Sequence, residues 1–410
     1  MIRNLVLLMV VAVSLIFFGC SNSGRDAKNL RLGSWDYSWM NEVKEKLKND
    51  EPEFLPAYEK LISDADKMLE GGVYSVTFKN MVPPSGSKHD YMSMGPYWWP
   101  DPQKSDGLPY IRRDGEVNPE RNNLDSPQLS RMINSVRNLS LAWFFSENNE
   151  YAKKAAELLR VWFLEPKTMM NPNLKYGQAI PGITEGRFIG IIDGRSFASL
   201  VDAIALLETS GLLTDEQKLG IKTWFENYFR WLTESQFGKD ESSYINNHSV
   251  AYDVQSCGIA YFIGNDKFLK NKVDSIPQKR IDHMIEANGR QPYELIRTKA
   301  FSYSVSNLRN FFDAGEIGFN VGVDIFSYVN PKEGSLQKAL DYLISYIGHK
   351  QVWPYEQISN WEQTENNLGL LIRKAARIYK NETYQTLWEE TFYERMKSHW
   401  SLLVSPELNK

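Results

Sequence analysis

The segment Thr214–Leu232, TDEQKLGIKTWFENYFRWL, carries the clearest helix signature in the chain. Its Thr-Asp-Glu-Gln start predicts a capping box, because the Thr hydroxyl and the Gln amide can satisfy N–H groups that the first helical turn leaves without partners. The apolar residues that follow recur at helical spacing and predict one buried stripe. They are Ile221, Trp224, Phe225, Tyr228 and Leu232.

The same periodicity recurs along most of the chain. A second stripe, at i, i+3, i+4, i+7, i+10 and i+11, consists of Ala152, Ala155, Ala156, Leu159, Trp162 and Phe163. About a dozen helices in series predict stacked antiparallel pairs, and a ring of helical hairpins is one arrangement of such pairs. No fixed repeat length is visible, so a solenoid of regular repeats is not supported. The other predicted helices lie near 36–49, 55–70, 126–147, 194–208, 247–263, 267–287, 305–329, 335–348, 364–380 and 383–402.

Length and charge limit the classes of function. The chain has 410 residues and a formal net charge of −4. It contains no long Lys/Arg tract, so it lacks the electrostatic footprint of a nucleic-acid-binding protein. A polyanion bound to this protein must therefore be held by local positive charge.

The N-terminus has the layout of a secretory signal. A charged start, Met1–Asn4, precedes the apolar run Leu5–Phe18, and Gly19-Cys20 closes the segment. This pattern resembles a bacterial lipobox and predicts cleavage before Cys20 and its lipidation. The alternative, a simple membrane helix, needs about 20 apolar residues, more than this run provides. We expect a signal peptide over 1–20, a flexible tether over 21–34 and one folded domain over 35–410, anchored by lipid in the bacterial cell envelope, at the periplasm or outer membrane.

Between residues 80 and 125, Pro and Gly interrupt every helical pattern. Loops of this length are uncommon and are often functional. Aromatic rings on such a loop can stack on sugar rings, and the alternative is that they only pin the loop to the helices. A second irregular segment, 169–182, precedes Gly186-Arg187 and is another candidate wall of a groove. The aromatic residues of the first loop are Tyr91, Tyr97, Trp98, Trp99 and Tyr110.

Asn246-Asn247-His248 stands at the predicted start of a helix, where unpaired N–H groups favour an anion. A substrate carboxylate could bind there. Tyr252 lies four residues after His248, on the same helix face, so its hydroxyl could orient the imidazole. The alternative is an Asn cap beside a buried, hydrogen-bonded histidine.

Arg297 and Tyr303 form a second candidate group. A guanidinium can neutralise a sugar carboxylate and a phenol can transfer a proton, which are functions that β-elimination requires. The two side chains can line one side of a groove only if the backbone between them is not a straight helix. Alternatively, Arg297 forms a salt bridge with Glu294.

The sequence contains no motif typical of metal-dependent, serine hydrolase or nucleotide-dependent enzymes. The five histidines are scattered without the close ligand pairs of zinc sites, so no metal and no other cofactor is predicted. There is no G-x-S-x-G elbow and no phosphate-binding Gly-rich loop before a helix. A glycosidase with two carboxylates stays open, although no pattern singles out a pair.

The chain resembles the alginate lyase superfamily, polysaccharide lyase families 5 and 38, over most of its mature length. The likeness to family 38 is the nearer one, because Ser304 stands where family 5 usually has a His after the tyrosine. The resemblance implies an all-α fold, an (α/α) toroid or incomplete barrel of roughly five to seven helical hairpins, with long ordered loops lining a groove. The matching segments are Tyr97–Pro102, Gly107–Tyr110, Asn171–Leu174, Gly186-Arg187, Gly190–Asp193, Asn246–His248, Glu294–Arg297 and Tyr303.

The resemblance also implies roles for individual residues. Asn247 and Arg297 would hold and neutralise the substrate carboxylate, while His248 and Tyr303 would transfer protons. The expected function is cleavage of 1,4-linked uronate polymers, above all alginate, by β-elimination to 4,5-unsaturated products. Alternatives are a lyase on glucuronan or another glucuronate polymer, and a non-catalytic glycan-binding lipoprotein. The expected substrate-binding residues are Tyr97, Trp98, Trp99, Tyr110, Gln178, Arg187 and Tyr252.

Overall fold

The computed structural model describes residues 30–49 and 51–408. Residues Arg31–Lys410 form one compact unit, and the fold below is that of this unit. The predicted signal peptide with Cys20, and most of the predicted tether, lie outside the described residues. In the described part, no helix is both long enough and apolar enough to cross a membrane.

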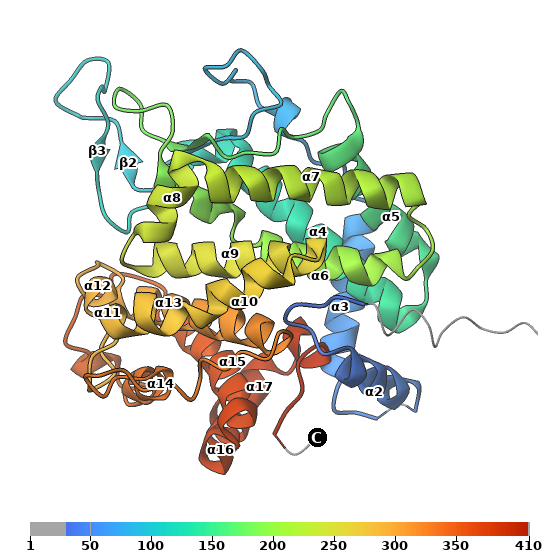
Figure 1. Cartoon of the computed structure of the whole chain (residues 1–410), viewed down its shortest axis with the longest axis vertical. Coiled ribbons are helices and arrows are strands. Elements are labelled where there is room, and N and C mark those ends of the chain that lie inside the picture. The colour runs from blue at the N-terminus through green and yellow to red at the C-terminus, as the bar shows by residue number, and fades with distance from the viewer. Residues whose placement is uncertain (1–29, 50, 409–410) are drawn as a thin grey trace, which may run out of the picture. The chain divides into compact units, whose positions relative to one another are not determined.

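Within the described residues, five long helices form an inner series. Each contacts the next in chain order, from α4 through α6, α9 and α13 to α15 (Figure 1). Most of α9 is buried, including polar residues, as expected for a helix that has neighbours on every side. The inner helices are α4 (Asp125–Ser146), α6 (Phe197–Glu208), α9 (Asn247–Ile263), α13 (Ala300–Phe319) and α15 (Trp361–Tyr379).

An outer helix accompanies most of the inner ones. The outer helix α5 packs on α4, α7 and α10 on α9, α14 on α13, and α16 on α15. Figure 1 shows α7 and α9 lying side by side. These are the stacked antiparallel pairs that the helical periodicity predicts. The outer helices are α5 (Asn149–Leu159), α7 (Asp215–Glu234), α10 (Asp266–Asp274), α14 (Leu336–Ile344) and α16 (Glu382–Thr391).

The C-terminal segment returns to the first helices. The short helix η8 (Trp400–Leu403) packs against α2 (Tyr37–Lys48) and α3 (Leu55–Leu69). The carbonyl of Val404 accepts a hydrogen bond from the backbone N–H of Asp36 at 2.9 Å. The helical series is therefore joined at its ends, and the architecture is the all-α (α/α) toroid that the sequence resemblance implies.

Helix α7 begins as predicted. The Thr214 hydroxyl accepts a hydrogen bond from the Gln217 backbone N–H at 3.2 Å, and the Gln217 amide oxygen accepts one from the Thr214 N–H at 2.9 Å. Its apolar stripe packs on α6, where the ring of Phe197 lies 5.7 Å from that of Phe225, centre to centre. The capping box and the stripe are both confirmed.

The segment over 80–125 is ordered by short strands and contacts to distant residues. Strand β1 pairs in parallel with β4 from the second irregular segment, and β2 pairs with β3 in antiparallel fashion. The 3₁₀ turn η3 then leads into α4. These elements are β1 (Met92–Met94), β2 (Trp98–Trp99), β3 (Ile111–Arg112), β4 (Tyr176–Ala179) and η3 (Pro119–Asn123).

Two predicted helices are shorter than expected. The pattern over 267–287 predicts one helix, but α10 ends at Asp274 and Pro277 opens a π turn, because proline has no N–H to continue the helix. The pattern over 383–402 is also divided, at Phe392. The remaining short elements are η2 (Val76–Phe78), η4 (Arg160–Leu164), η5 (Phe188–Gly194), α8 (Gln236–Ser243), η6 (Pro277–Ile281), α11 (Asp282–Met284), α12 (Pro292–Leu295), η7 (Lys350–Val352) and α17 (Tyr393–Met396).

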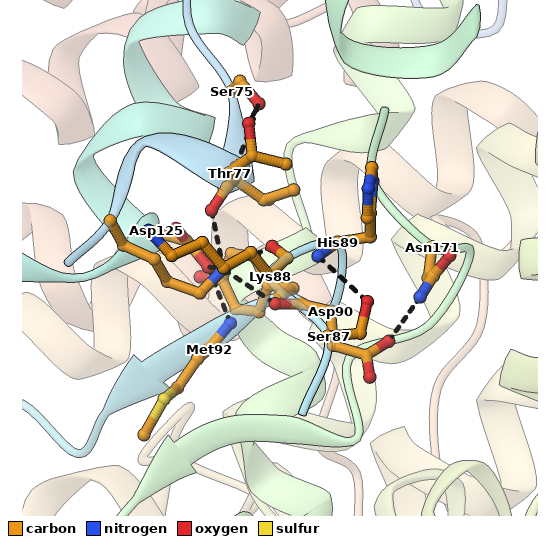
Figure 2. A network of polar contacts seen from close by, with 12 residues as sticks. Ser75, Thr77, Ser87, Lys88, His89, Asp90, Met92, Asp125 and Asn171 are labelled. Carbon is orange, nitrogen blue, oxygen red and sulfur yellow. Dashed lines mark hydrogen bonds and ion pairs between the residues drawn. The ribbon is translucent and has the colours of Figure 1, made fainter. Parts of the chain in front are cut away.

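A buried ion pair fixes the start of the long loop to α4. The ammonium of Lys79 lies 2.9 Å from Oδ2 of Asp125 and also donates hydrogen bonds to three backbone carbonyls. The same carboxylate accepts from the N–H of Met92 at 2.8 Å, and the Asp90 carboxylate accepts from the Asn171 amide close by (Figure 2). Buried charges are tolerated when they are paired and hydrogen-bonded in this way.

Candidate active site

Arg297 and Tyr303 lie together at the start of α13. Arg297 belongs to the turn between α12 and α13, so the connecting backbone is not a straight helix, as their contact requires. Its Nη2 donates a hydrogen bond to the Tyr303 hydroxyl at 2.7 Å, and the guanidinium carbon lies 3.9 Å from the centre of the tyrosine ring. The Tyr303 hydroxyl donates in turn to the hydroxyl of Tyr97 at 2.8 Å.

Asp114 holds the guanidinium in place. Arg297 donates to both of its carboxylate oxygens, from Nη2 at 2.7 Å and from Nε at 3.1 Å. Burial opposes the charge on Asp114, but hydrogen bonds from Arg297 and Arg112 outweigh it and lower the pKa of this carboxyl well below its usual range. The alternative reading, a salt bridge between Arg297 and Glu294, is wrong, because Arg297 pairs with Asp114 from the long loop.

Glu294 instead holds Asn247. Its two oxygens accept hydrogen bonds from the backbone N–H and the side-chain Nδ2 of Asn247, both at 2.7 Å. One of the two Nδ2 hydrogens remains for a ligand. Burial raises the pKa of Glu294, and both Arg297 and His248 are close enough to lower it in part. Glu294 therefore connects the two candidate groups that the sequence analysis singles out.

His248 faces a buried carboxylate. Asn246 caps α9 by accepting from the His248 N–H at 2.9 Å, and the imidazole Nδ1 lies 3.0 Å from Oε1 of Glu241. Glu241 is fully buried at the end of α8, and burial raises its pKa despite the histidine. When Nδ1–H donates to the carboxylate, Nε2 keeps its lone pair and can accept a proton.

Tyr252 does not orient the histidine, so this prediction is wrong. Its ring is buried between α7 and α10, and its hydroxyl donates to the carbonyl of Leu232 at 3.2 Å. The ammonium of Lys272 lies 4.8 Å from the ring centre. Tyr252 does lie one helical turn after His248, as predicted. The neighbouring helices enclose its side chain, and Glu241 is the hydrogen-bond partner of the histidine instead.

The aromatic loop residues have mixed surroundings. Trp98 lies 6.0 Å from the guanidinium of Arg187, measured to the ring centre, and Trp99 donates its indole N–H to the Glu116 carbonyl at 3.0 Å. Tyr110 donates to the Glu120 carboxylate at 2.7 Å, and burial together with this bond raises its pKa to about 12. Trp99 and Tyr110 thus help to fix the loop, while all three rings keep part of their surface exposed.

Buried Gln178 and half-buried Arg187 are joined by a hydrogen bond beside the loop. Gln178 has a left-handed backbone, with φ of 50°, and its Oε1 accepts from Nη2 of Arg187 at 2.9 Å. Its Nε2 donates to Asp193 at 3.2 Å. The amide of Gln178 therefore supports Arg187 and Asp193 directly. Among the described residues, no group of three or more His, Cys, Asp or Glu side chains is arranged to hold a metal ion.

The family model for alginate lyase matches residues 75–353, which include every one of these active-site side chains. The chain belongs to the alginate lyase family. It is therefore a polysaccharide lyase. A crystal structure of an alginate lyase from Bacteroides ovatus is 41% identical in sequence, with a TM-score of 0.88 over 92% of this chain and 98% of that one.

A more distant structure shares the fold alone. It is a histidine-to-alanine variant of alginate lyase A1-III in complex with a tetrasaccharide, with 14% identity and a TM-score of 0.53 over 77% of this chain and 86% of that one. No curated protein sequence matches this chain.

Three carboxylates of the site are not predicted from the sequence, namely Asp114, Glu241 and Glu294 as a partner of Asn247. Asp114 is separated from Arg297 by 183 residues, and no local pattern links them. Glu241 is only seven residues before His248. Helix α8, which was not predicted, places Glu241 beside the histidine. A prediction of this helix would have indicated that the two side chains can meet.

Proposed function

We propose that the protein cleaves alginate and that it does so by β-elimination at the site around Tyr303. The observation that carries this proposal is the position of the Tyr303 hydroxyl, which accepts from Arg297 and donates to Tyr97. A phenol held between a cation and a second phenol can lose and regain a proton in place. Family membership and the similarity to the Bacteroides ovatus enzyme support alginate as the polymer.

Charge neutralisation is the first requirement of the reaction. The C5 proton of a uronate becomes acidic only when the neighbouring carboxylate is neutralised, because negative charge then develops on it as an enolate. Asn247 offers its remaining Nδ2 hydrogen, and Arg297 offers Nη1, since Asp114 and Tyr303 use Nε and Nη2. These two donors bind the carboxylate in our proposal.

Proton transfer then depends on the sugar. In L-guluronate, the C5 hydrogen and the C4 oxygen lie on opposite faces of the ring. His248 takes the C5 proton, the C–H electrons form the C4–C5 double bond, the C4–O4 bond breaks, and Tyr303 gives its proton to O4. Burial, and then Tyr97, raise the pKa of Tyr303 well above its usual value, so it enters this step as the protonated acid.

In D-mannuronate the hydrogen and the oxygen lie on the same face, so Tyr303 can act first as base and then as acid. It must be ionised to take the C5 proton. At pH values below its pKa, the ionised fraction of a tyrosine increases about tenfold for each unit by which the pH rises. We therefore expect cleavage of polymannuronate to rise more steeply with pH than cleavage of polyguluronate.

The role of His248 gives a selective test. A His248→Ala variant should lose about a hundredfold or more of its kcat on polyguluronate, as expected for a lost general base, and much less on polymannuronate. His283→Ala, at an exposed histidine outside the site, is the control and should leave both rates unchanged. Equal losses on the two polymers would contradict the assignment of His248 as the guluronate base.

The chemical nature of the products separates elimination from hydrolysis. Digestion of a defined alginate oligosaccharide should give fragments whose masses add up to that of the substrate, with one unsaturated end. Fragments heavier by one water would instead indicate hydrolysis by paired carboxylates. Glucuronan, tested in parallel, shows whether another uronate polymer is accepted.

We also propose that the enzyme acts at the bacterial cell envelope. The support is the sequence pattern alone, a charged start and an apolar run that end in Gly19-Cys20. Metabolic labelling with a fatty acid tests this proposal, because label should enter the wild-type protein and be absent from Cys20→Ala.

A further inference from the structure

A cavity of about 310 Å³ lies in the middle of the helical ring. All five inner helices and both ends of the folded chain contribute to its wall. Its volume is at the lower end of the range for small-molecule sites. The residues that line it and enter the argument are Arg137 on α4, Arg195 before α6, Arg309 and Asn310 on α13, and Trp400 and Ser405 in the C-terminal segment.

The wall of this central cavity is strongly cationic. Lys374 is compensated, since it contacts Asp313 at 3.0 Å and Glu316 at 2.6 Å, and Arg373 is paired with Glu407. The guanidinium of Arg195 makes no hydrogen bond or ion pair with any residue in the described part of the chain, and its side chain is exposed to the cavity. The cavity therefore holds positive charge that the protein itself does not neutralise.

Arg137 adds to this excess. Its guanidinium donates to the amide oxygen of Asn138 and lies 4.3 Å from the ring centre of Trp400, but no carboxylate in the described residues contacts it. Burial, and then the charge of Arg309, lower its pKa to about 10, so it stays charged at neutral pH. Desolvation inside the helical ring, and then the charge of Arg309, also lower the pKa of Arg195. A bound anion would relieve this repulsion.

Other groups of the cavity suit a sugar acid rather than a simple ion. Ser405 lines the cavity, and its buried hydroxyl has no hydrogen-bond partner in the described structure. The rings of Trp35 and Trp400 meet edge to face at 6.2 Å, and Trp400 borders the cavity. Aromatic surfaces of this kind pack against the C–H faces of sugar rings.

Two helices, α9 and α13, contribute residues to both the central cavity and the active site. Asn310 follows Tyr303 by seven residues on α13, and Val254 follows Asn247 by seven on α9, so each pair shares a helix face about 10 Å apart. Arg195 is the third link, because it is close enough to Tyr97 and Tyr303 for their charges to influence it.

We propose that this central cavity binds the carboxylate of a uronate unit about two helical turns, roughly 10 Å, away from the bond that is cleaved, with Arg195 and Arg137 as its cationic partners. This inference rests on the proposed function and extends it. The enzyme then recognises its polymer at two charged positions, the cleavage site and the cavity. Guanidinium groups suit this role because their planar donors match a carboxylate.

The test measures binding in the full chain carrying Tyr303→Phe, so that no substrate is consumed. Calorimetry with a five-unit mannuronate oligosaccharide should give a Kd about tenfold higher after Arg195→Gln and a larger increase after Arg137→Gln is added. Arg195→Lys, which keeps the charge, should restore most of the binding. Arg131→Gln, at an exposed arginine on α4, is the matched control and should have no effect.

Two further probes, a neutral oligosaccharide and inorganic sulfate, distinguish which chemical group the cavity binds. A carboxyl-reduced, neutral five-unit oligosaccharide should bind the Arg195→Gln variant and its parent equally. An unchanged Kd for the acidic oligosaccharide, or an equal loss for the neutral one, would overturn the proposal. Binding of inorganic sulfate that depends on Arg195, with oligosaccharide binding unaffected, would also overturn it and identify a site for free anions. Because binding is the readout, failure of the elimination reaction itself would appear separately, as absence of unsaturated product.

Discussion

At the scale of single residues, three carboxylates contact the candidate reacting groups. Asp114 holds Arg297, Glu294 holds Asn247 and Glu241 faces His248. The family resemblance singled out the candidate reacting residues. Their partners could not be predicted, because two of these contacts join segments 47 and 183 residues apart.

Asp114 gives the sharpest prediction at this scale. Asp114→Asn removes the charge that fixes Arg297, so the guanidinium can move away from the Tyr303 hydroxyl. We expect kcat on alginate to fall by about tenfold to a hundredfold, which corresponds to about 1.4 to 2.7 kcal/mol of transition-state free energy. Steady-state kinetics should show a smaller change in KM.

Asp106→Asn is the control, because Asp106 is an exposed carboxylate of the same loop. It should leave kcat unchanged. If Asp114→Asn retained full kcat, Asp114 would have no positioning role and the geometry of Arg297 would be maintained by Tyr303 alone.

At the scale of elements, the capping box and stripe of α7 were predictable because all their determinants lie within one segment. The pattern over 305–329 gave the wrong limits for α13, which runs over Ala300–Phe319. Its first turn is capped from a distance, since the Gln357 amide oxygen accepts from the N–H groups of Phe301 and Ser302. A cap supplied 55 residues away leaves no local signal.

The buried pair between Lys79 and Asp125 fixes the long loop to α4. Figure 2 shows Asp125 with its second partner, the backbone N–H of Met92. Lys79→Met should reduce the free energy of unfolding by about 3 to 5 kcal/mol, because it leaves the buried carboxylate without its cation. Burial, opposed by Lys79, already raises the pKa of Asp125 to about 6. Denaturation in urea measures the loss.

Lys104→Met serves as the control for this experiment, since Lys104 is exposed in the same loop. Its effect should stay within about 0.5 kcal/mol. A similarly small effect of Lys79→Met would mean that the pair does not anchor the loop.

At the scale of the folded unit, the resemblance predicted the toroid, while the way its ends meet could not be foreseen. The contacts between the C-terminal segment and α2 and α3 join residues that are hundreds of positions apart in the chain. Asp202 on α6 makes another long-range connection, because its carboxylate accepts from the N–H groups of Gly33 and Ser34.

Asp202 makes the stability of the unit dependent on pH. Burial raises its pKa to about 6, above the value of about 3.9 for an unfolded chain. Its contribution is therefore fully present below pH 4 and is lost as the pH rises through about 6. We call the difference in free energy of unfolding between the wild type and a variant the stability margin. For Asp202→Asn, this margin should decrease by about 3 kcal/mol between pH 4 and pH 7.

Urea denaturation at several pH values tests this dependence, with Asn227→Ser, at an exposed residue of α7 that does not ionise, as the control. The margin over the control should be independent of pH. A constant margin over Asp202→Asn as well would show that Asp202 keeps an ordinary pKa in the folded protein.

The most direct test of the account is the ultraviolet absorbance of the conjugated unsaturated uronate during incubation with polymannuronate, polyguluronate and glucuronan. We predict that absorbance rises on alginate blocks with the wild-type enzyme, and that Tyr303→Phe abolishes the rise while binding to the polymer is retained. An undiminished rise with Tyr303→Phe would contradict the central role of this tyrosine. No rise with the wild type on any of the three polymers would contradict elimination itself.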